Sequence, residues 1–498
     1  MKNLKALSIL SLCIIVSCSY EGRFPRSSSG FIETYAPEGL AGGDQYTELE
    51  ENRYFKTEDH PVSTFSTDAD GASYANMRRF VTKDEMIPYK GAIRTEEFIN
   101  YFNLDYPVVQ NEHPISLNGE VSQCPWNTDH KLLRVGIKGK PIPEGELPNS
   151  NFVFLIDVSG SMADEDKLTM LKSGFKLFVD QMREDDRVAI VTYAGEDKLH
   201  LESTSGKEKD KIKKAIQSLG WGGSTAGAAG ITTAYEIARE NFIEGGNNRI
   251  ILGTDGDFNV GIWDKDELIK LIEEKRETGI FLTVLGVGRG NLNDAALEQI
   301  ANHGNGTYEY IDHIEQLRKV FLYDFQKFYA VAKDVKVQIE FNPENVLSYR
   351  LIGYENRVLA TEDFKDDKKD AGEIGANQNV TALYEIVPTG NNEFRTTPTF
   401  TVNFRYKRPD SDESVPMSLG VYDQGKVFDD ASGFMKFTAG VASFSLLLTD
   451  SEYKGYTSYK KVLKWVSQAR LTDPNGFKEE LFELIKAAED LPKARSSE

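Results

Sequence analysis

Three oxygen-bearing side chains stand at alternate positions where an apolar stretch of the sequence ends. Residues 152–156 are all apolar, and Asp157, Ser159 and Ser161 follow directly. One carboxylate and two hydroxyls are hard oxygen ligands, the type that Mg²⁺, Mn²⁺ and Ca²⁺ take. A tight turn after the strand brings such oxygens to one point at the carboxyl end of a sheet. This turn is predicted to require Gly160, because a residue without a Cβ adopts backbone angles that a bulkier residue resists. This segment therefore predicts half of a divalent-cation site.

Two later segments could complete the site. Thr225 lies in the glycine-rich stretch 222–227, ahead of a helical pattern, and Asp255 follows the apolar run 250–252. Taken alone, the first segment is better explained as an ordinary polar turn, because Asp, Ser and Gly are common turn residues. The presence of all three segments in order, each beside a predicted strand or helix, favours the cation site.

The three segments resemble the metal-ion-dependent adhesion site of the von Willebrand factor type A family, which reads D-x-S-x-S, then T, then D. The matching positions are Asp157, Ser159, Ser161, Thr225 and Asp255. The resemblance implies that the hydroxyls reach the metal directly or nearly so and that the aspartates act mostly through water. It also implies an open position that a carboxylate of a protein partner fills. Mg²⁺ is the implied cofactor, with Mn²⁺ or Ca²⁺ as alternatives.

Strand-like and helical patterns alternate across residues 149–328, the range predicted for the type A domain. An amphipathic helix is predicted at 168–182 and a second helix at 293–301. This alternation predicts an α/β fold, a doubly wound, Rossmann-like parallel sheet with helices on both faces. The predicted strands lie at 151–156, 187–193, 249–252, 281–287 and 308–311.

The remaining folded sequence flanks this domain on both sides. The chain has 498 residues, more than one hydrophobic core usually serves, so two or three domains are expected. Residues 51–145 resemble the amino-terminal α+β domain that accompanies type A domains in a family of bacterial lipoproteins. Residues 329–492 resemble the carboxy-terminal domain of unknown function in the same lipoproteins. Their pattern predicts a β-rich, mostly antiparallel part followed by helices at 437–448, 459–469 and 477–488.

The first residues predict a targeting segment. Residues 1–17 have a lysine-containing start and a short apolar stretch, as in a signal peptide, and Cys18 follows. The end of this stretch resembles a bacterial lipobox, which implies a lipid on Cys18 and a chain anchored in the cell envelope; a plain secretory signal is the alternative. Residue 19 is Ser and not the acidic residue that retains some lipoproteins in the inner membrane, which favours the outer membrane as the destination. Residues 18–50 are predicted to be a flexible tether, so the lipid would be the only membrane contact.

Charge and side-chain inventory argue against several functions. A formal net charge of −20 disfavours nucleic acid and anionic membranes as partners. The six histidines have no zinc spacing, and no nucleophile elbow is present. We therefore expect a binding protein that captures an acidic residue of a protein partner, and not an enzyme. A metal-assisted hydrolase using Asp257 as a base and a scaffold with a purely structural cation are the alternatives.

Several charged residues cluster in the amino-terminal region. Arg78, Arg79 and Arg94 lie close in sequence to Glu96 and Glu97. These side chains could form ion pairs where two domains meet. They could equally form a solvated face, which is the commoner arrangement for such residues.

Overall fold

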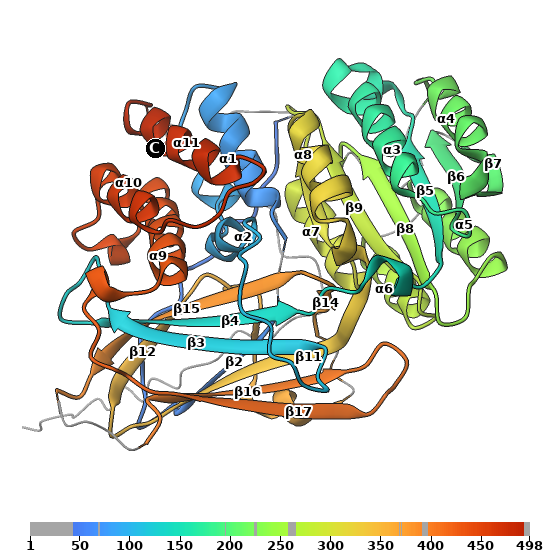
Figure 1. Ribbon diagram of the computed structural model, residues 1–498. Coiled ribbons are helices and arrows are strands. Elements are labelled where there is room, and N and C mark those ends of the chain that lie inside the picture. The colour runs from blue at the N-terminus through green and yellow to red at the C-terminus, as the bar shows by residue number, and fades with distance from the viewer. Residues whose placement is uncertain are drawn as a thin grey trace, which may run out of the picture.

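The computed structural model describes residues 43–67, 70–194, 196–223, 227–256, 265–367, 369, 371–390 and 397–492. The strands of these residues form three sheets. Figure 1 shows one sheet enclosed by helices on the right, two sheets stacked below, and a separate group of helices above them.

Six strands form the first sheet, called here the α/β sheet. They are β5 (Ser150–Asp157), β6 (Arg187–Ala194), β7 (Glu196–Ser205), β8 (Asn247–Thr254), β9 (Phe281–Val287) and β10 (Tyr308–Ile311). Their order is β10-β9-β8-β5-β6-β7, and all neighbours run parallel except β6 and β7. Every residue of the central strand β5 is buried, as expected for a strand covered on both faces.

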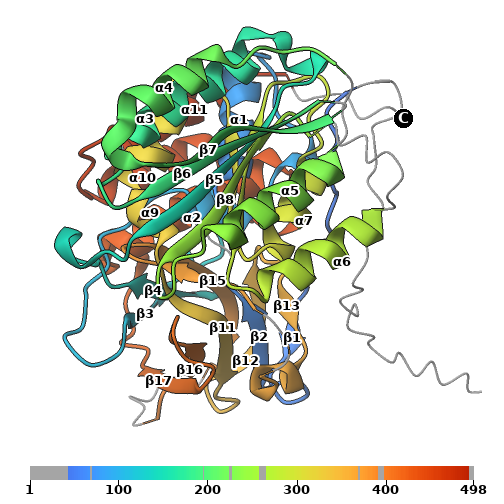
Figure 2. The same cartoon turned by 90° about the vertical axis from the view of Figure 1, so that its right-hand side faces the viewer.

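Helices cover both faces of the α/β sheet (Figure 2). One face carries α3 (Met170–Gln181), α4 (Lys209–Ser218) and α8 (Ile314–Arg318), and the other carries α5 (Gly227–Glu240), α6 (Lys265–Arg276) and α7 (Asp294–His303). Alternate residues of β5 pack against the helices on the two faces, because successive strand side chains point in opposite directions. Phe154 stacks on Phe175 of α3 with ring centroids 4.3 Å apart. Val153 and Leu155 join the cluster of the opposite face.

Antiparallel strands form the other two sheets. The strands are β1 (Phe55–Lys56), β2 (Val62–Ser66), β3 (Ile115–Gln123), β4 (Lys131–Gly139), β11 (Ala330–Phe341), β12 (Val346–Ile352), β13 (Val358–Leu359), β14 (Ile374–Gly375), β15 (Asn379–Pro388), β16 (Phe400–Lys407) and β17 (Ser414–Val421). One sheet has the order β1-β12-β15-β4-β3, and the other has β13-β2-β11-β16-β17 with β14 paired to β11. Each sheet therefore combines strands from both ends of the chain.

These two sheets pack face to face as a β-sandwich. Val135 and Tyr384 from one sheet share a hydrophobic cluster with Val337 and Phe341 from the other. The Phe341 ring stacks on Tyr349 with centroids 4.0 Å apart. Because the amino- and carboxy-terminal strands pair within each sheet, the regions on either side of the α/β unit fold together.

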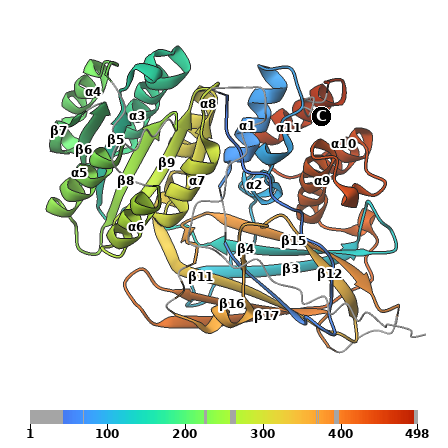
Figure 3. The ribbon, with the colours of Figure 1, turned by 180° about the vertical axis from the view of Figure 1, so that it is seen from behind.

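Five helices form a second core above the sandwich and beside the α/β unit (Figure 3). They are α1 (Ala72–Thr82), α2 (Thr95–Asn100), α9 (Gly433–Leu448), α10 (Tyr459–Gln468) and α11 (Phe477–Glu489). Tyr74, Phe98, Phe437 and Trp465 lie in this core, which mixes both ends of the chain. None of the helices in the described part of the chain is long and apolar enough to cross a membrane.

The predicted doubly wound α/β fold and the β-rich, then helical, carboxy-terminal region are confirmed. One detail of the prediction is wrong, because the sheet is not wholly parallel. β7 returns beside β6 in an antiparallel hairpin and forms one edge of the sheet. The sequence of β7, Glu196–Ser205, is mostly polar, so it lacked the apolar run by which the other strands were found.

Candidate metal centre

Asp157 is buried at the carboxyl end of β5 and is held there by three donors. The Ser159 amide donates to its Oδ1 over 2.9 Å. The Thr254 and Tyr193 hydroxyls donate to its Oδ2 over 3.0 and 3.3 Å. Burial raises the pKa of Asp157, and the hydrogen bonds from Ser159 partly offset that rise. The carboxylate is thus fixed in position by neutral groups.

The two predicted serine ligands lie together in the turn after β5. Their hydroxyl oxygens are 3.0 Å apart, and Ser159 is 1% exposed. The short 3-10 helix η3 (Gly160–Ala163) begins between them. The prediction that this turn requires glycine at position 160 is wrong. A Cβ at Gly160 would make only an ordinary 3.6 Å contact with the Gly223 carbonyl, and its φ is not positive.

Asp255 follows β8, the parallel neighbour of β5, and it is fully buried. Because Ile156 pairs with Gly253, the two aspartates lie at the same end of adjacent strands. The next residue does need to be glycine. Gly256 has a φ of +85°, and a Cβ there would approach the Asn293 amide nitrogen to 2.8 Å.

We call Asp157, Ser159, Ser161 and Asp255 the carboxylate edge. The fifth predicted ligand, Thr225, lies outside the described residues, as does Asp257. The residues before Thr225 are joined to the carboxylate edge by backbone hydrogen bonds. The Gly222 amide donates to the Val158 carbonyl over 2.8 Å, and the Gly160 amide donates to the Gly223 carbonyl over 3.1 Å. The loop that carries Thr225 therefore starts beside the turn, as a common site requires.

Two further residues contact the carboxylate edge and were missed from the sequence. The Lys167 ammonium and the Asn291 amide both donate to Oδ2 of Asp255, over 3.1 and 3.0 Å. Asn291 lies in the loop after β9, so the rule that parallel strands end at one edge could have found it. Lys167 lies in the π-helical turn η4 (Glu165–Thr169) before α3, and no sequence signal marked it.

The donor set of the carboxylate edge suits a hard divalent cation. It offers two buried carboxylates and two hydroxyls, all of them oxygen ligands. In the part of the chain that the structure describes, no group of three or more His, Cys, Asp or Glu side chains could hold a metal. A cation at the carboxylate edge would therefore depend on hydroxyls and water as well as on carboxylates.

Comparison with known proteins matches three consecutive parts of the chain. Residues 151–322 match the von Willebrand factor type A domain, and residues 41–134 match a model described as von Willebrand factor. Residues 326–491 match the carboxy-terminal region of the uncharacterized protein YfbK. YfbK of Escherichia coli (strain K12) is itself 40% identical over 472 residues, which cover 90% of this chain and 81% of YfbK. The chain belongs to the YfbK-like family of type A domain proteins.

Other similarities are more distant. The uncharacterized protein sll0103 of Synechocystis is 28% identical over 41% of this chain and 48% of its own length. A solved von Willebrand factor type A structure from Catenulispora acidiphila is 14% identical, with a TM-score of 0.44, and the match covers 76% of this chain and 91% of that one. None of the families matched here is described by an enzymatic activity. Type A domains commonly bind proteins, and many bind divalent cations.

In this YfbK-like chain the amino-terminal region is joined to the carboxylate edge through the β9–α7 loop. Oδ1 of Asp44 accepts from the Gly290 and Leu292 amides over 2.6 and 3.1 Å. The Gln45 amide donates to the Leu292 carbonyl over 2.7 Å. Asn291, which contacts Asp255, lies between these anchored residues. The segment at 44–45 therefore fixes the backbone that carries one donor of the site.

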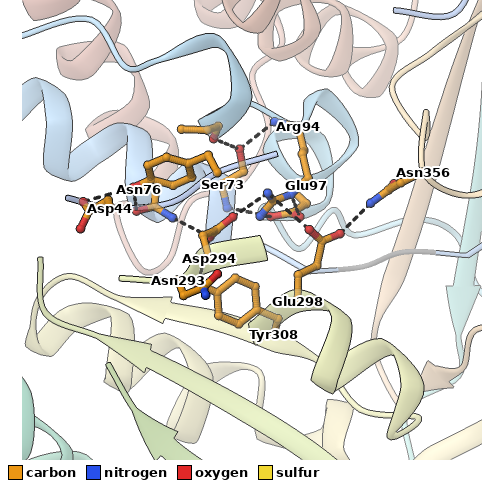
Figure 4. Close-up of polar contacts among 12 residues, drawn as sticks. Asp44, Ser73, Asn76, Arg94, Glu97, Asn293, Asp294, Glu298, Tyr308 and Asn356 are labelled. Atoms are coloured by element: carbon orange, nitrogen blue, oxygen red, sulfur yellow. Dashed lines mark hydrogen bonds and ion pairs between the residues drawn. The ribbon is translucent and has the colours of Figure 1, made fainter. Parts of the chain in front are cut away.

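The amino-terminal arginines form buried ion pairs where two parts of the molecule meet. Arg94 lies 2.7 Å from Asp294 of α7 and also pairs with Glu97 (Figure 4). Arg78 donates to both oxygens of Asp312 over 2.8 and 2.7 Å. Of the two interpretations left open by the sequence, the structure supports the domain contact and not the solvated face.

Proposed function

We propose that this protein captures an acidic residue of a protein partner through a divalent cation held by Asp157, Ser159, Ser161, Thr225 and Asp255. Mg²⁺ is the proposed ion, with Mn²⁺ or Ca²⁺ as chemically similar alternatives. The observation that carries the proposal is the meeting of two buried carboxylates and two facing hydroxyls at one end of adjacent strands. Membership of a family whose domains commonly bind proteins adds support.

The charge balance of the site favours an anionic partner group. Three of the proposed ligands are neutral hydroxyls, so a bound cation would keep few negative ligands close to it. Mg²⁺ prefers six oxygen ligands and usually retains waters, and a carboxylate from outside can replace one of them. When bound, the cation would supply the positive charge that attracts this carboxylate. The chain's own residues would hold the ion and leave one position for the partner.

The test is calorimetric titration of Mg²⁺ and Mn²⁺ into chelator-treated protein. Removing a residue that only hydrogen-bonds to a metal ligand weakens metal binding by about 10–100-fold. Asp157→Asn removes a proposed ligand itself, so it should weaken Mg²⁺ and Mn²⁺ binding at least about tenfold. Ser161→Ala should also weaken metal binding. Asp185→Asn is the matched control, because Asp185 is exposed before β6, at the opposite end of the sheet. Equal binding by the wild type and Asp157→Asn would overturn the proposal.

The proposed site of action is the cell envelope, with the chain held by a lipid on Cys18 and the outer membrane as its destination. The support is the apolar stretch that ends in Ser17 and Cys18. A lipid-anchored chain would partition into the membrane fraction and incorporate labelled palmitate in bacteria. Cys18→Ser should abolish both properties. Cys13→Ser is the control, since that residue would leave with the signal peptide, and loss of labelling in this variant instead would contradict the assignment.

A further inference from the structure

Lys167 places a positive charge inside the carboxylate edge. Its ammonium donates to Asp255 Oδ2 over 3.1 Å, to the Ser161 carbonyl over 3.0 Å and to Asn291 Oδ1 over 2.9 Å. These three acceptors match the three protons of an ammonium group. The Lys167 side chain is 5% exposed. A buried lysine in this position is a built-in part of the site and not a surface residue that happens to lie near it.

The surrounding backbone accommodates this side chain specifically. Lys167 has φ −114° and ψ −106°, so the chain departs from helical geometry at this residue before α3 begins. Across from it, Gly288 has a φ of +78°, and a Cβ there would lie 2.4 Å from Lys167 Cε. A side chain at position 288 would therefore collide with the lysine. Both segments leave room for the lysine to reach Asp255.

The lysine changes the charge that a metal ion meets. Asp157 and Asp255 contribute two negative charges, and Lys167 offsets one of them. A divalent cation added to the three groups would leave a net positive site, whereas the same cation without the lysine would leave a neutral one. Charges a few ångströms apart interact strongly at the effective dielectric of a protein, so this difference should change metal affinity by a measurable factor.

We propose that Lys167 is an internal counter-cation that weakens divalent-metal binding at the carboxylate edge and keeps the metal-loaded site positive towards an anionic partner. This inference rests on the proposed function, because it concerns the same cation. The lysine would hold Asp255 in place before the metal arrives. It would then disfavour the metal unless a carboxylate from the partner is also present.

The counter-cation role and a purely structural role of Lys167 predict opposite changes in metal affinity when the lysine is removed. If Lys167 only orients Asp255, its removal misplaces a ligand and weakens metal binding. If it acts as a counter-cation, its removal strengthens metal binding. Lys167→Met removes the charge and keeps an unbranched side chain that is one atom shorter. Lys167→Gln removes the charge and keeps an N–H donor, so it separates loss of charge from loss of the hydrogen bond.

The experiment is calorimetric titration of Mn²⁺ into the wild type, Lys167→Met, Lys167→Gln and Asp157→Asn. Both lysine variants should bind Mn²⁺ at least about tenfold more tightly than the wild type. The matched control is Lys336→Met. Lys336 is also a buried lysine paired with an aspartate, Asp334 at 2.9 Å, but it lies on β11 in the sandwich. The Lys336→Met variant should bind Mn²⁺ with the same affinity as the wild type.

The outcomes separate this inference from the proposed function. Unchanged or weaker binding in both lysine variants, with binding lost in Asp157→Asn, overturns the counter-cation role and leaves the metal site intact. Unchanged binding in Asp157→Asn overturns both. Binding by the lysine variants where the wild type shows none supports the counter-cation, and no binding by any variant overturns both. If a variant is too unstable for titration, thermal unfolding replaces calorimetry. A larger Mn²⁺-induced rise in the Tm of the lysine variant than in that of the wild type then supports the counter-cation role, and a smaller rise overturns it.

Discussion

The carboxylates at the carboxylate edge and those at the interface with the helical group are similarly buried, but they are satisfied differently. Asp294 and Asp312 each accept from an arginine, and Asp312 does so with both oxygens. Asp157 accepts from an amide and two hydroxyls, and Asp255 accepts from an amide and a lysine. An arginine fork satisfies a carboxylate almost completely, whereas the neutral donors of Asp157 leave much of its charge uncompensated. The first set joins two parts of the molecule, and the second set is the proposed cation site.

The pKa shifts of two of these groups follow the same division. Burial raises the pKa of Asp157, and the Ser159 hydrogen bonds offset only part of the rise. Burial acts on Asp312 in the same direction, but the Arg78 guanidinium outweighs it and holds the pKa of Asp312 well below its ordinary value. Burial thus disfavours the ionised form of Asp157, whereas Arg78 favours the ionised form of Asp312.

The largest expected effect is on stability, when an interface arginine is removed. Arg78→Met would leave Asp312 buried without its guanidinium and would also break the contact with Glu480. Breaking a buried ion pair costs about 3–5 kcal/mol of unfolding free energy. Urea unfolding of the wild type and the variant measures this loss of unfolding free energy. Arg318→Met, which removes a half-exposed pair with Glu315, is the control and should change stability by no more than about 0.5 kcal/mol. Equal losses in the two variants would contradict the distinction.

A smaller effect is expected from Asp312→Asn, and it should depend on pH. Because its folded-state pKa is lowered, Asp312 contributes stability that is fully present above the unfolded value of about 3.9 and is lost as the pH falls below it. At pH 7 the variant should lose about 1.5–3 kcal/mol, the usual contribution of hydrogen bonds to charged groups. Unfolding followed from pH 7 to pH 2 should show this difference shrinking below roughly pH 4. A constant difference would exclude the ion pair as its cause.

A still smaller effect on stability is expected at the carboxylate edge. Without metal, Asp157→Asn should change the unfolding free energy by less than about 1 kcal/mol, because burial already disfavours the negative charge at this position. With Mg²⁺ present, the wild type should gain in Tm and the variant should not. Thermal unfolding with and without chelator tests both statements. A loss as large as that in Arg78→Met would place Asp157 among the structural carboxylates.

The smallest effect is spectroscopic and concerns Trp221. This side chain is 60% exposed, in the loop whose next residue, Gly222, donates to Val158. Metal binding at the adjacent turn should alter the surroundings of the Trp221 ring and cause a small change in its fluorescence. Trp221→Phe should remove that change, although the other three tryptophans still fluoresce. Trp126 and Trp465 are buried in the helical core, and Trp263 lies outside the described residues. The same metal-dependent change in Trp221→Phe would show that the signal arises elsewhere.

The sequence predicted those features that depend on local patterns. The apolar run of β5 and the spacing of the α3 residues were enough to predict the doubly wound fold, because each pattern reflects burial of one element. The polar strand β7 lacked such a run and was missed. The sandwich could not be predicted in detail, because strands such as β2 and β11 pair across more than half of the chain.

The candidate site shows the same limit. The motif identified Asp157 and Asp255 as neighbours in space, since both end parallel strands. Lys167 was not found, because its sequence position is that of an ordinary residue at the start of a helix. Its role depends on the departure of the backbone from helical geometry and on the space left by Gly288, which only the folded chain reveals.

The central claim is that a divalent cation binds at the carboxylate edge. The most direct measurement is anomalous diffraction from crystals of the wild type grown with Mn²⁺. We predict an anomalous peak within coordination or water-bridging distance of Asp157, Ser159, Ser161 and Asp255. A crystal with Mn²⁺ bound elsewhere, and no peak beside these residues, would contradict the account.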